Sequence, residues 1–219
     1  MKPENNEKKI IPSHIQIETV AGYCTVRCIM CPIENSLRKE IMSNDLFERI
    51  IQKLLPIKNN IKLFSIVGIG EPLIDKDVAE KVELAKKYGF TGVGIYSNGT
   101  NLSKELSLKL INAKLDTFIF SIDGFLNETQ AAIRVGSNLE KIIENIDYFI
   151  DRRKELGSNT KIIIRFTKQE KNQNEWDNFF NFWNRKLSKK YGDAISCYDV
   201  INTGNSVEND IGRLLEKKK

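Results

Sequence analysis

The sequence has few of the residue types that build many metal sites, and it lacks long apolar runs. Its 219 residues include one histidine, His14, and four cysteines. No stretch approaches the roughly 18 consecutive apolar residues of a membrane-spanning helix. The polar segment 1–12 also lacks the apolar core of a signal peptide. A membrane span and a secretory leader are therefore not expected. Residues 1–12 are predicted to be a flexible segment, and the protein is predicted to be cytoplasmic.

The chain carries a modest excess of positive charge. It has 34 lysine and arginine residues against 29 aspartate and glutamate residues, which gives a formal net charge of +5 at pH 7. Three of the lysines are the last residues, 217–219. The other basic residues are scattered rather than interleaved with aromatic side chains, as they would be in a nucleic-acid interface. A nucleic-acid partner is therefore not the first expectation, and an RNA-modifying enzyme stays an alternative.

Apolar, strand-like runs alternate with amphipathic helical patterns along the chain. Strands are expected at residues 15–20, 63–67, 92–96, 117–121, 161–166 and 194–201, and helices at 43–55, 76–88, 103–113, 138–156 and 174–190. This alternation is typical of a parallel sheet with helical crossovers. The fold class is therefore α/β, and six units favour a partial (β/α)6 TIM-like barrel over a closed barrel of eight. An open doubly wound sheet is the alternative. Residues 13–201 would form the core domain.

Polar and glycine-rich clusters follow four of the expected strands. The first strand is followed by three cysteines, the second by Gly68 to Pro72, the third by Ser97 and Asn98, and the fourth by Ser121 to Gly124. In both architectures, ligands bind at the carboxyl ends of parallel strands. We therefore expect these four clusters to meet at one site.

Cys24, Cys28 and Cys31 have the spacing C-x3-C-x2-C. In a reducing cytoplasm, closely spaced cysteines indicate metal ligands rather than disulfides. An iron–sulfur cube normally takes four thiolates, so three would leave one iron open for chemistry. The alternative, zinc, needs a fourth ligand, and His14 lies upstream of the motif. Cys197, the remaining cysteine, is expected to be a small buried hydrophobic residue.

These motifs resemble those of the radical S-adenosylmethionine (radical SAM) superfamily. Gly70 to Pro72 is similar to the family's Gly-Gly-Glu-Pro segment, and Ser121 to Gly124 is similar to its fourth-strand motif. The resemblance spans residues 13–201. It implies that the three cysteines bind a [4Fe–4S] cluster whose fourth iron chelates S-adenosylmethionine. One electron would then cleave a carbon–sulfur bond of that cofactor, and the resulting 5′-deoxyadenosyl radical would take a hydrogen atom from an organic substrate.

The resemblance also implies which residues contact the cofactor, although it assigns no catalytic residue. Glycines would let the backbone approach the cofactor closely, and a glutamate would accept a hydrogen bond from the cofactor's amino group. Hydroxyl and amide side chains would bind the ribose or the carboxylate of the cofactor, and an arginine would pair with that carboxylate. The implied set is Met30, Gly68, Gly70, Glu71, Pro72, Ser97, Asn98, Ser121, Asp123 and Arg134. Arg165 competes with Arg134, and Asp123 is equally well explained by a turn or cap. Met30 replaces a frequent aromatic residue, and Ile69 replaces a glycine.

The segment Cys28 to Pro32 resembles the SPASM subgroup, whose members carry an extra cysteine-rich C-terminal domain for auxiliary clusters. Only Cys197 follows the motif here, so residues 202–219 are interpreted as a tail or as the start of such a domain. The leading hypothesis is a radical SAM enzyme that acts on a peptide or small metabolite and receives electrons from a donor such as flavodoxin or ferredoxin. The alternative is a cluster-binding sensor or assembly protein without turnover.

Overall fold

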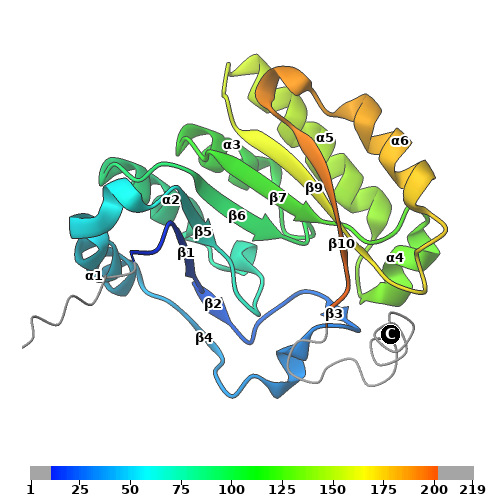
Figure 1. Ribbon diagram of the computed structural model, residues 1–219, viewed down its shortest axis with the longest axis horizontal. Coiled ribbons are helices and arrows are strands. Elements are labelled where there is room, and N and C mark those ends of the chain that lie inside the picture. Colours follow the sequence, from blue (N-terminus) through cyan, green and yellow to red (C-terminus); the bar gives the residue numbers. More distant parts are fainter. Residues whose placement is uncertain (1–10, 202–219) are drawn as a thin grey trace, which may run out of the picture.

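The computed structural model describes residues 11–201, which build one six-stranded parallel sheet (Figure 1). Its strands are β1 (His14–Ile17), β5 (Leu63–Ile66), β6 (Val93–Ser97), β7 (Thr117–Ser121), β9 (Lys161–Lys168) and β10 (Ala194–Asp199). They lie in the order β1-β5-β6-β7-β9-β10, and every neighbouring pair is parallel. Each strand is added on the same side as the last, whereas a doubly wound sheet reverses direction. Because β1 and β10 do not pair, the barrel is open, and the predicted partial barrel is confirmed.

Helices connect the strands and cover one face of the sheet (Figure 1). They are α1 (Asn44–Leu54), α2 (Val78–Lys87), α3 (Lys104–Asn112), α4 (Asn127–Ile133), α5 (Leu139–Glu155) and α6 (Trp176–Lys186). Short 3-10 helices are η1 (Pro32–Asn35), η2 (Leu55–Asn60), η3 (Pro72–Ile74) and η4 (Lys189–Tyr191). Ser43, Ser103 and Asn138 cap α1, α3 and α5, each accepting a hydrogen bond from the backbone N–H three residues later. Such caps satisfy N–H groups that the first helical turn leaves unpaired.

The hydrophobic core lies between the sheet and these helices. Alternate strand residues point into it, and those without exposed surface include Phe64, Phe118, Phe120, Ile162 and Ile164. Along β9, buried residues alternate with half-buried ones, which face the open side of the sheet. The aromatic stripe of α6 closes the core at one end, since Phe179 is fully buried with its ring centroid 4.6 Å from that of Phe166.

Three expectations about local structure are corrected. The first strand does not run to residue 20: β1 ends at Ile17, and β2 (Val20–Ala21) pairs antiparallel with β4 (Glu40–Ile41). The chain bends at Thr19, and the carboxylate of Glu18 accepts the backbone N–H of Ile69. Helix α4 lies where no helix is expected, because seven residues are too few to show a clear helical period. Cys197 is exposed rather than buried, because β10 is an edge strand of the sheet.

The segment between β1 and α1 crosses the lower side of the view in Figure 1. Within it, β3 (Arg27–Cys28) pairs antiparallel with β8 (Arg134–Val135), so the cysteine loop is tied to the segment between α4 and α5. No helix in the described part of the chain is both long and apolar enough to cross a membrane. The predictions for the N-terminal segment and for residues 202–219 lie outside the described residues, except at positions 11 and 12.

Candidate functional site

The three cysteines line a cavity of about 320 Å³ at the carboxyl ends of the strands. The backbone N–H of Cys31 donates to the carbonyl of Cys28 at 3.0 Å, and this turn brings the second and third cysteines together. The β3–β8 ladder places Cys28 opposite Arg134. A loop that is fixed at its middle by two short strands therefore presents the thiols.

The strand-end clusters meet around this cavity, whose lining comes from the loop after β1, the ends of β5, β6 and β7, and β9. The site residues expected from the sequence that line it are Cys24, Cys28, Met30, Cys31, Gly68, Gly70, Glu71, Ser97, Asn98, Ser121, Arg134 and Arg165. Pro72 and Asp123 are not among the lining residues: Pro72 begins η3, and Asp123 has no exposed surface. A larger hollow of about 880 Å³, between α3 and α5, is lined by none of these residues.

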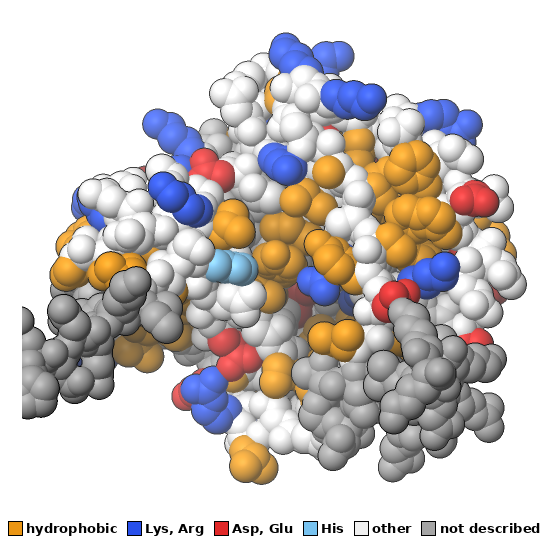
Figure 2. Space-filling model, in the orientation of Figure 1, with side chains coloured by type: hydrophobic (Ala, Val, Ile, Leu, Met, Phe, Trp, Pro, Cys, Tyr) orange, Lys and Arg blue, Asp and Glu red, His pale blue; other side chains and the backbone are white. Residues whose placement is uncertain are grey.

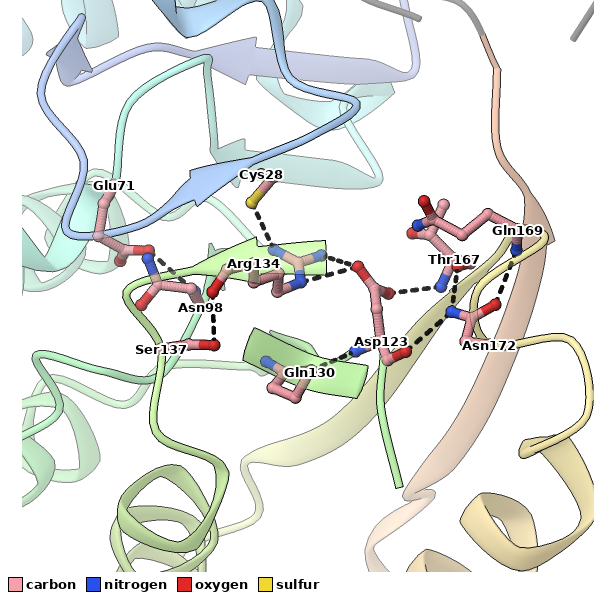
Figure 3. Close-up of polar contacts among 10 residues, drawn as sticks. All are labelled: Cys28, Glu71, Asn98, Asp123, Gln130, Arg134, Ser137, Thr167, Gln169 and Asn172. Carbon is pink, nitrogen blue, oxygen red and sulfur yellow. Dashed lines mark hydrogen bonds and ion pairs between the residues drawn. The ribbon is translucent and has the colours of Figure 1, made fainter. Parts of the chain in front are cut away.

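A buried carboxylate holds Arg134 in place. Nε and Nη2 of Arg134 each lie 2.7 Å from the same oxygen of Asp123, and Nη1 of Arg134 lies 3.4 Å from Sγ of Cys28 (Figure 3). The other oxygen of Asp123 accepts the backbone N–H of Thr167 at 2.7 Å. Burial lowers the pKa of Arg134, but the Asp123 carboxylate and Cys28 raise it more, so this pKa lies above its ordinary value. The guanidinium is therefore charged, and both oxygens of Asp123 are engaged within the protein.

Two buried residues that the sequence analysis does not select hold Asp123 in turn. Oε1 of Gln130 accepts the backbone N–H of Asp123 at 2.8 Å, and Nδ2 of Asn172 donates to the carbonyls of Asp123 and Thr167 at 2.8 and 2.9 Å (Figure 3). Thr167 follows the fifth expected strand and lines the cavity, so the rule that ligands bind at strand ends is the signal that points to it. Gln130 lies in the unexpected helix α4 and has no comparable sequence signal.

Glu71 is buried and tied to the loop after β6. Its two carboxylate oxygens accept the backbone N–H groups of Leu73 at 3.0 Å and of Asn98 at 2.8 Å. Burial raises the pKa of Glu71 above its ordinary value, although these two N–H groups lower it in part. Asn98 also donates through Nδ2 toward Sγ of Cys24 at 3.5 Å and to Oγ1 of Thr25 at 3.1 Å. Glu71 thus positions a donor to a cysteine sulfur as well as lining the cavity.

Two glycines allow the segment after β5 to pack closely against the start of the cysteine loop. A Cβ built on Gly70 would lie 2.2 Å from the backbone oxygen of Val20, and one built on Gly68 would lie 2.3 Å from Cγ of Glu18. Both distances are far below van der Waals contact, so a side chain at either position would push the loop away. Close packing therefore explains these glycines before any ligand is considered.

Burial raises the pKa of all three thiols. The pKa of Cys28 rises to about 11, chiefly because of burial and in spite of the nearby positive charge of Arg134. Burial is also the largest cause for Cys24 and Cys31. The charge of Cys31 also raises the pKa of Cys24 and of Cys28. Metal binding would therefore have to displace the thiol protons.

Comparison with known proteins identifies the family. The sequence model of the Radical SAM superfamily matches residues 19–172. The chain therefore belongs to the radical SAM superfamily, a family of enzymes whose cofactors are a [4Fe–4S] cluster and S-adenosylmethionine. The resemblance expected from the cysteine motif and the strand ends is confirmed.

Curated relatives cover most of this chain, but the chain covers only part of them. It is 28% identical over 212 residues to the probable GTP 3′,8-cyclase of Methanothermobacter marburgensis, covering 96% of this chain and 64% of that protein. The probable GTP 3′,8-cyclase of Methanothermobacter thermautotrophicus is 31% identical over 199 residues, covering 89% of this chain and 60% of that protein. The tungsten-containing aldehyde ferredoxin oxidoreductase cofactor-modifying protein of Pyrococcus furiosus is 30% identical over 141 residues, covering 64% and 39%. The chain thus spans less than two thirds of the length of each.

Solved structures show the same core fold. SuiB of Streptococcus suis bound to S-adenosylmethionine matches with a TM-score of 0.69 and 20% identity, covering 95% of this chain and 47% of SuiB. Native anSMEcpe with bound AdoMet matches with a TM-score of 0.63 and 18% identity, covering 87% and 53%. At such low identities the likeness extends to the fold alone.

The chemistry of the donor set, three cysteine thiols at one cavity, is compatible with an iron–sulfur cube. No three His, Cys, Asp or Glu side chains among residues 11–201 are placed to hold one metal ion. A cube instead presents three irons to three separate thiolates. Nη1 of Arg134 and Nδ2 of Asn98 donate toward two of the cysteine sulfurs, and such contacts support thiolate ligands. The three cysteines that line the cavity would therefore hold a [4Fe–4S] cluster.

Proposed function

We propose that this chain is the core of a radical SAM enzyme in which Cys24, Cys28 and Cys31 hold the [4Fe–4S] cluster and S-adenosylmethionine occupies the adjoining cavity. The observation that carries this proposal is that the three thiols, the glycine–glutamate segment after β5 and charged Arg134 line one cavity. When bound, the cluster and cofactor supply one-electron cleavage of a carbon–sulfur bond and removal of a hydrogen atom from the substrate. Residues 13–201 form this core.

The residues of the chain bind and orient the cofactor. Gly68 and Gly70 hold the segment after β5 against the cysteine loop, and Pro72 fixes the turn that presents Glu71. Ser97, Asn98 and Ser121 offer hydroxyl and amide groups for ribose or carboxylate, while Met30 lines the cavity as an apolar surface. The charged guanidinium of Arg134 pairs with the methionine carboxylate. Asp123 is a positioning residue, because it orients that guanidinium.

The substrate is an organic molecule, either a peptide or a small metabolite, and a cytoplasmic electron donor such as flavodoxin or ferredoxin reduces the cluster. A purine nucleotide is a second candidate substrate. It is favoured by the alignment of 96% of this chain with a protein named probable GTP 3′,8-cyclase.

Anaerobic reconstitution of the full chain with iron and sulfide, followed by dithionite and S-adenosylmethionine, tests the proposal. The expected result is a brown protein with equal amounts of iron and sulfide that forms 5′-deoxyadenosine. The variant Cys28→Ala should lose the cluster, whereas Cys197→Ala, which changes the exposed cysteine of β10, should retain it. An intact cluster with bound cofactor but no 5′-deoxyadenosine would favour a sensor or assembly protein. Zinc in place of iron would contradict the proposal.

A further inference from the structure

Arg165 brings a positive charge to the cavity without a counter-charge from the described residues. It lies on β9 among the residues that line the cavity. Its Nε is buried and has no hydrogen-bond partner in the described part of the chain. Its guanidinium lies 4.9 Å from the ring centroid of Tyr198 on β10. A buried donor without a partner costs free energy, so such a group is normally satisfied by a ligand or water.

Two hydroxyl groups flank Arg165 in the sheet. In the strand register it lies beside Ser121 of β7 on one side and Ser196 of β10 on the other. Residues in register on neighbouring strands point to the same face, so both hydroxyls share the open side of the sheet with the guanidinium. Figure 2 shows this side, where basic side chains lie among hydrophobic ones. A guanidinium between two O–H donors is suited to an oxyanion.

The other charged side chains at the cavity already have partners. Arg134 is paired with Asp123, and the carboxylate of Glu71 accepts two backbone N–H groups. Neither carboxylate is therefore left to neutralise Arg165. An anion that enters the cavity is the natural partner.

The position of Arg165 favours the substrate, rather than the cofactor, as the source of that anion. The segment from Gly68 to Glu71 follows β5, and β9 lies three strands further along the sheet. At about 4.8 Å between strands, this separation is about 14 Å. The amino and carboxylate groups of methionine share one carbon atom, so for the cofactor carboxylate to lie beside Glu71 the Arg165 side chain would have to reach across most of this separation. Arg134, whose Nη1 contacts Cys28, is better placed for the carboxylate of the cofactor.

We propose that Arg165, which lines the cavity, binds an anionic carboxylate or phosphoryl group of the substrate. The inference rests on the proposed function, since it places the substrate beside the cofactor in the same cavity. The Tyr198 ring, 4.9 Å from the guanidinium carbon, adds a cation–π contact that stabilises the charge of Arg165. The substrate class is thereby narrowed to anionic molecules.

Binding of simple anions to the reconstituted full chain tests this assignment. The probes are inorganic pyrophosphate for phosphoryl groups and glutarate for carboxylates, each titrated calorimetrically without oxygen. The variant Arg165→Met should weaken binding of at least one probe about tenfold or more, and Arg165→Lys should weaken it less. Lys168→Met, which removes an exposed charge from the same strand outside the cavity, should leave both affinities unchanged. Unaltered affinities in Arg165→Met, or no binding of either probe to the unmodified protein, would overturn the proposal.

A second pair of probes separates substrate from cofactor. S-adenosylhomocysteine carries the amino-acid carboxylate, whereas 5′-methylthioadenosine lacks it. Their affinity ratio should be the same in the unmodified protein and in Arg165→Met. A selective loss of S-adenosylhomocysteine binding would assign Arg165 to the cofactor and refute the substrate site. Iron and sulfide contents are measured on every sample. If the unmodified protein does not form the cluster, the proposed function fails. If Arg165→Met contains less cluster than the unmodified protein, the affinities are compared between the unmodified protein and Arg165→Lys instead.

Discussion

Two buried arginine–aspartate pairs in the described part of the chain lie at opposite ends of the sheet. At the amino ends of the strands, Arg153 of α5 forms a two-point contact with Asp193, just before β10, at 2.6 and 2.9 Å. At the carboxyl ends, Arg134 contacts one oxygen of Asp123 through two nitrogens at 2.7 Å. Both aspartate side chains are 0% exposed. The residue types are the same, so any difference in role must come from their surroundings.

The remaining contacts of each pair differ. Asp193 accepts the backbone N–H groups of Ile162 and Ser188, and Arg153 donates to the carbonyl of Thr160. All of these contacts join backbone segments, so the pair fixes β9 and β10. Arg134 instead directs one nitrogen at the sulfur of a cysteine. In β/α barrels the amino ends serve stability and the carboxyl ends serve chemistry, and the two pairs follow this division.

The variant Asp193→Ala should cause the largest loss of stability, because it leaves the guanidinium of Arg153 buried and uncompensated. Breaking one partner of a buried pair lowers the free energy of unfolding by about 3–5 kcal/mol. Chemical unfolding without oxygen measures the change. Asp199→Ala, at an exposed site on β10, is the control and should change stability by less than about 0.5 kcal/mol. A loss below about 1 kcal/mol for Asp193→Ala would show that this pair does not hold the strands.

Asp123→Asn should distinguish a pair that only stabilises the fold from a pair that positions a group beside the cysteines. The amide keeps an acceptor oxygen, so we expect a smaller loss of stability, about 2 kcal/mol. Because Arg134 loses its counter-charge and orientation beside Cys28, the reconstituted variant should release iron faster to a chelator. Asp193→Asn is the matched control: it should lose comparable stability but keep iron at the normal rate. Equal iron release by both variants would mean that the pair at the carboxyl ends is also purely structural.

The parallel α/β architecture was predictable from the sequence, although the strand patterns alone leave a doubly wound order as an alternative to the partial barrel. Strand and helix periods are local signals, and short apolar runs between amphipathic stretches imply parallel strands without knowledge of tertiary contacts. The rule that strand ends form the site then brought Glu71, Asn98 and Ser121 to one cavity, although they are far apart in the sequence.

Contacts that depend on side-chain direction were not predictable. The Arg153–Asp193 pair joins residues 40 positions apart, and nothing in either local segment marks them. Helix α4, with no side-chain cap at Leu126, lacks a start signal as well as length. The sequence also left Asp123 undecided between ligand and turn. Only its burial and its contacts to Arg134 show that its oxygens face inward.

Arg134→Lys should have a smaller effect on stability and a clear effect on cofactor binding. A lysine keeps the charge, but it lacks the planar fork that contacts Asp123 and Cys28 at the same time. Affinity of the reconstituted variant for S-adenosylhomocysteine should fall about tenfold. Arg153→Lys should bind this ligand normally once folded, although it is less stable. Normal affinity in Arg134→Lys would remove Arg134 from the cofactor site.

The smallest effect on stability is expected for an exposed ion pair between an arginine and a carboxylate. Nε of Arg27 lies 2.6 Å from Glu34, close to Cys28 and Cys31 in sequence, but the two side chains are 53% and 76% exposed. Solvent screens such a pair, so Glu34→Gln should change the free energy of unfolding by less than about 1 kcal/mol, and added salt should abolish the difference. Iron content should not change, because Arg27 still donates to the carbonyl of Cys24. A larger, salt-independent loss would show that burial does not separate structural from incidental pairs in this protein.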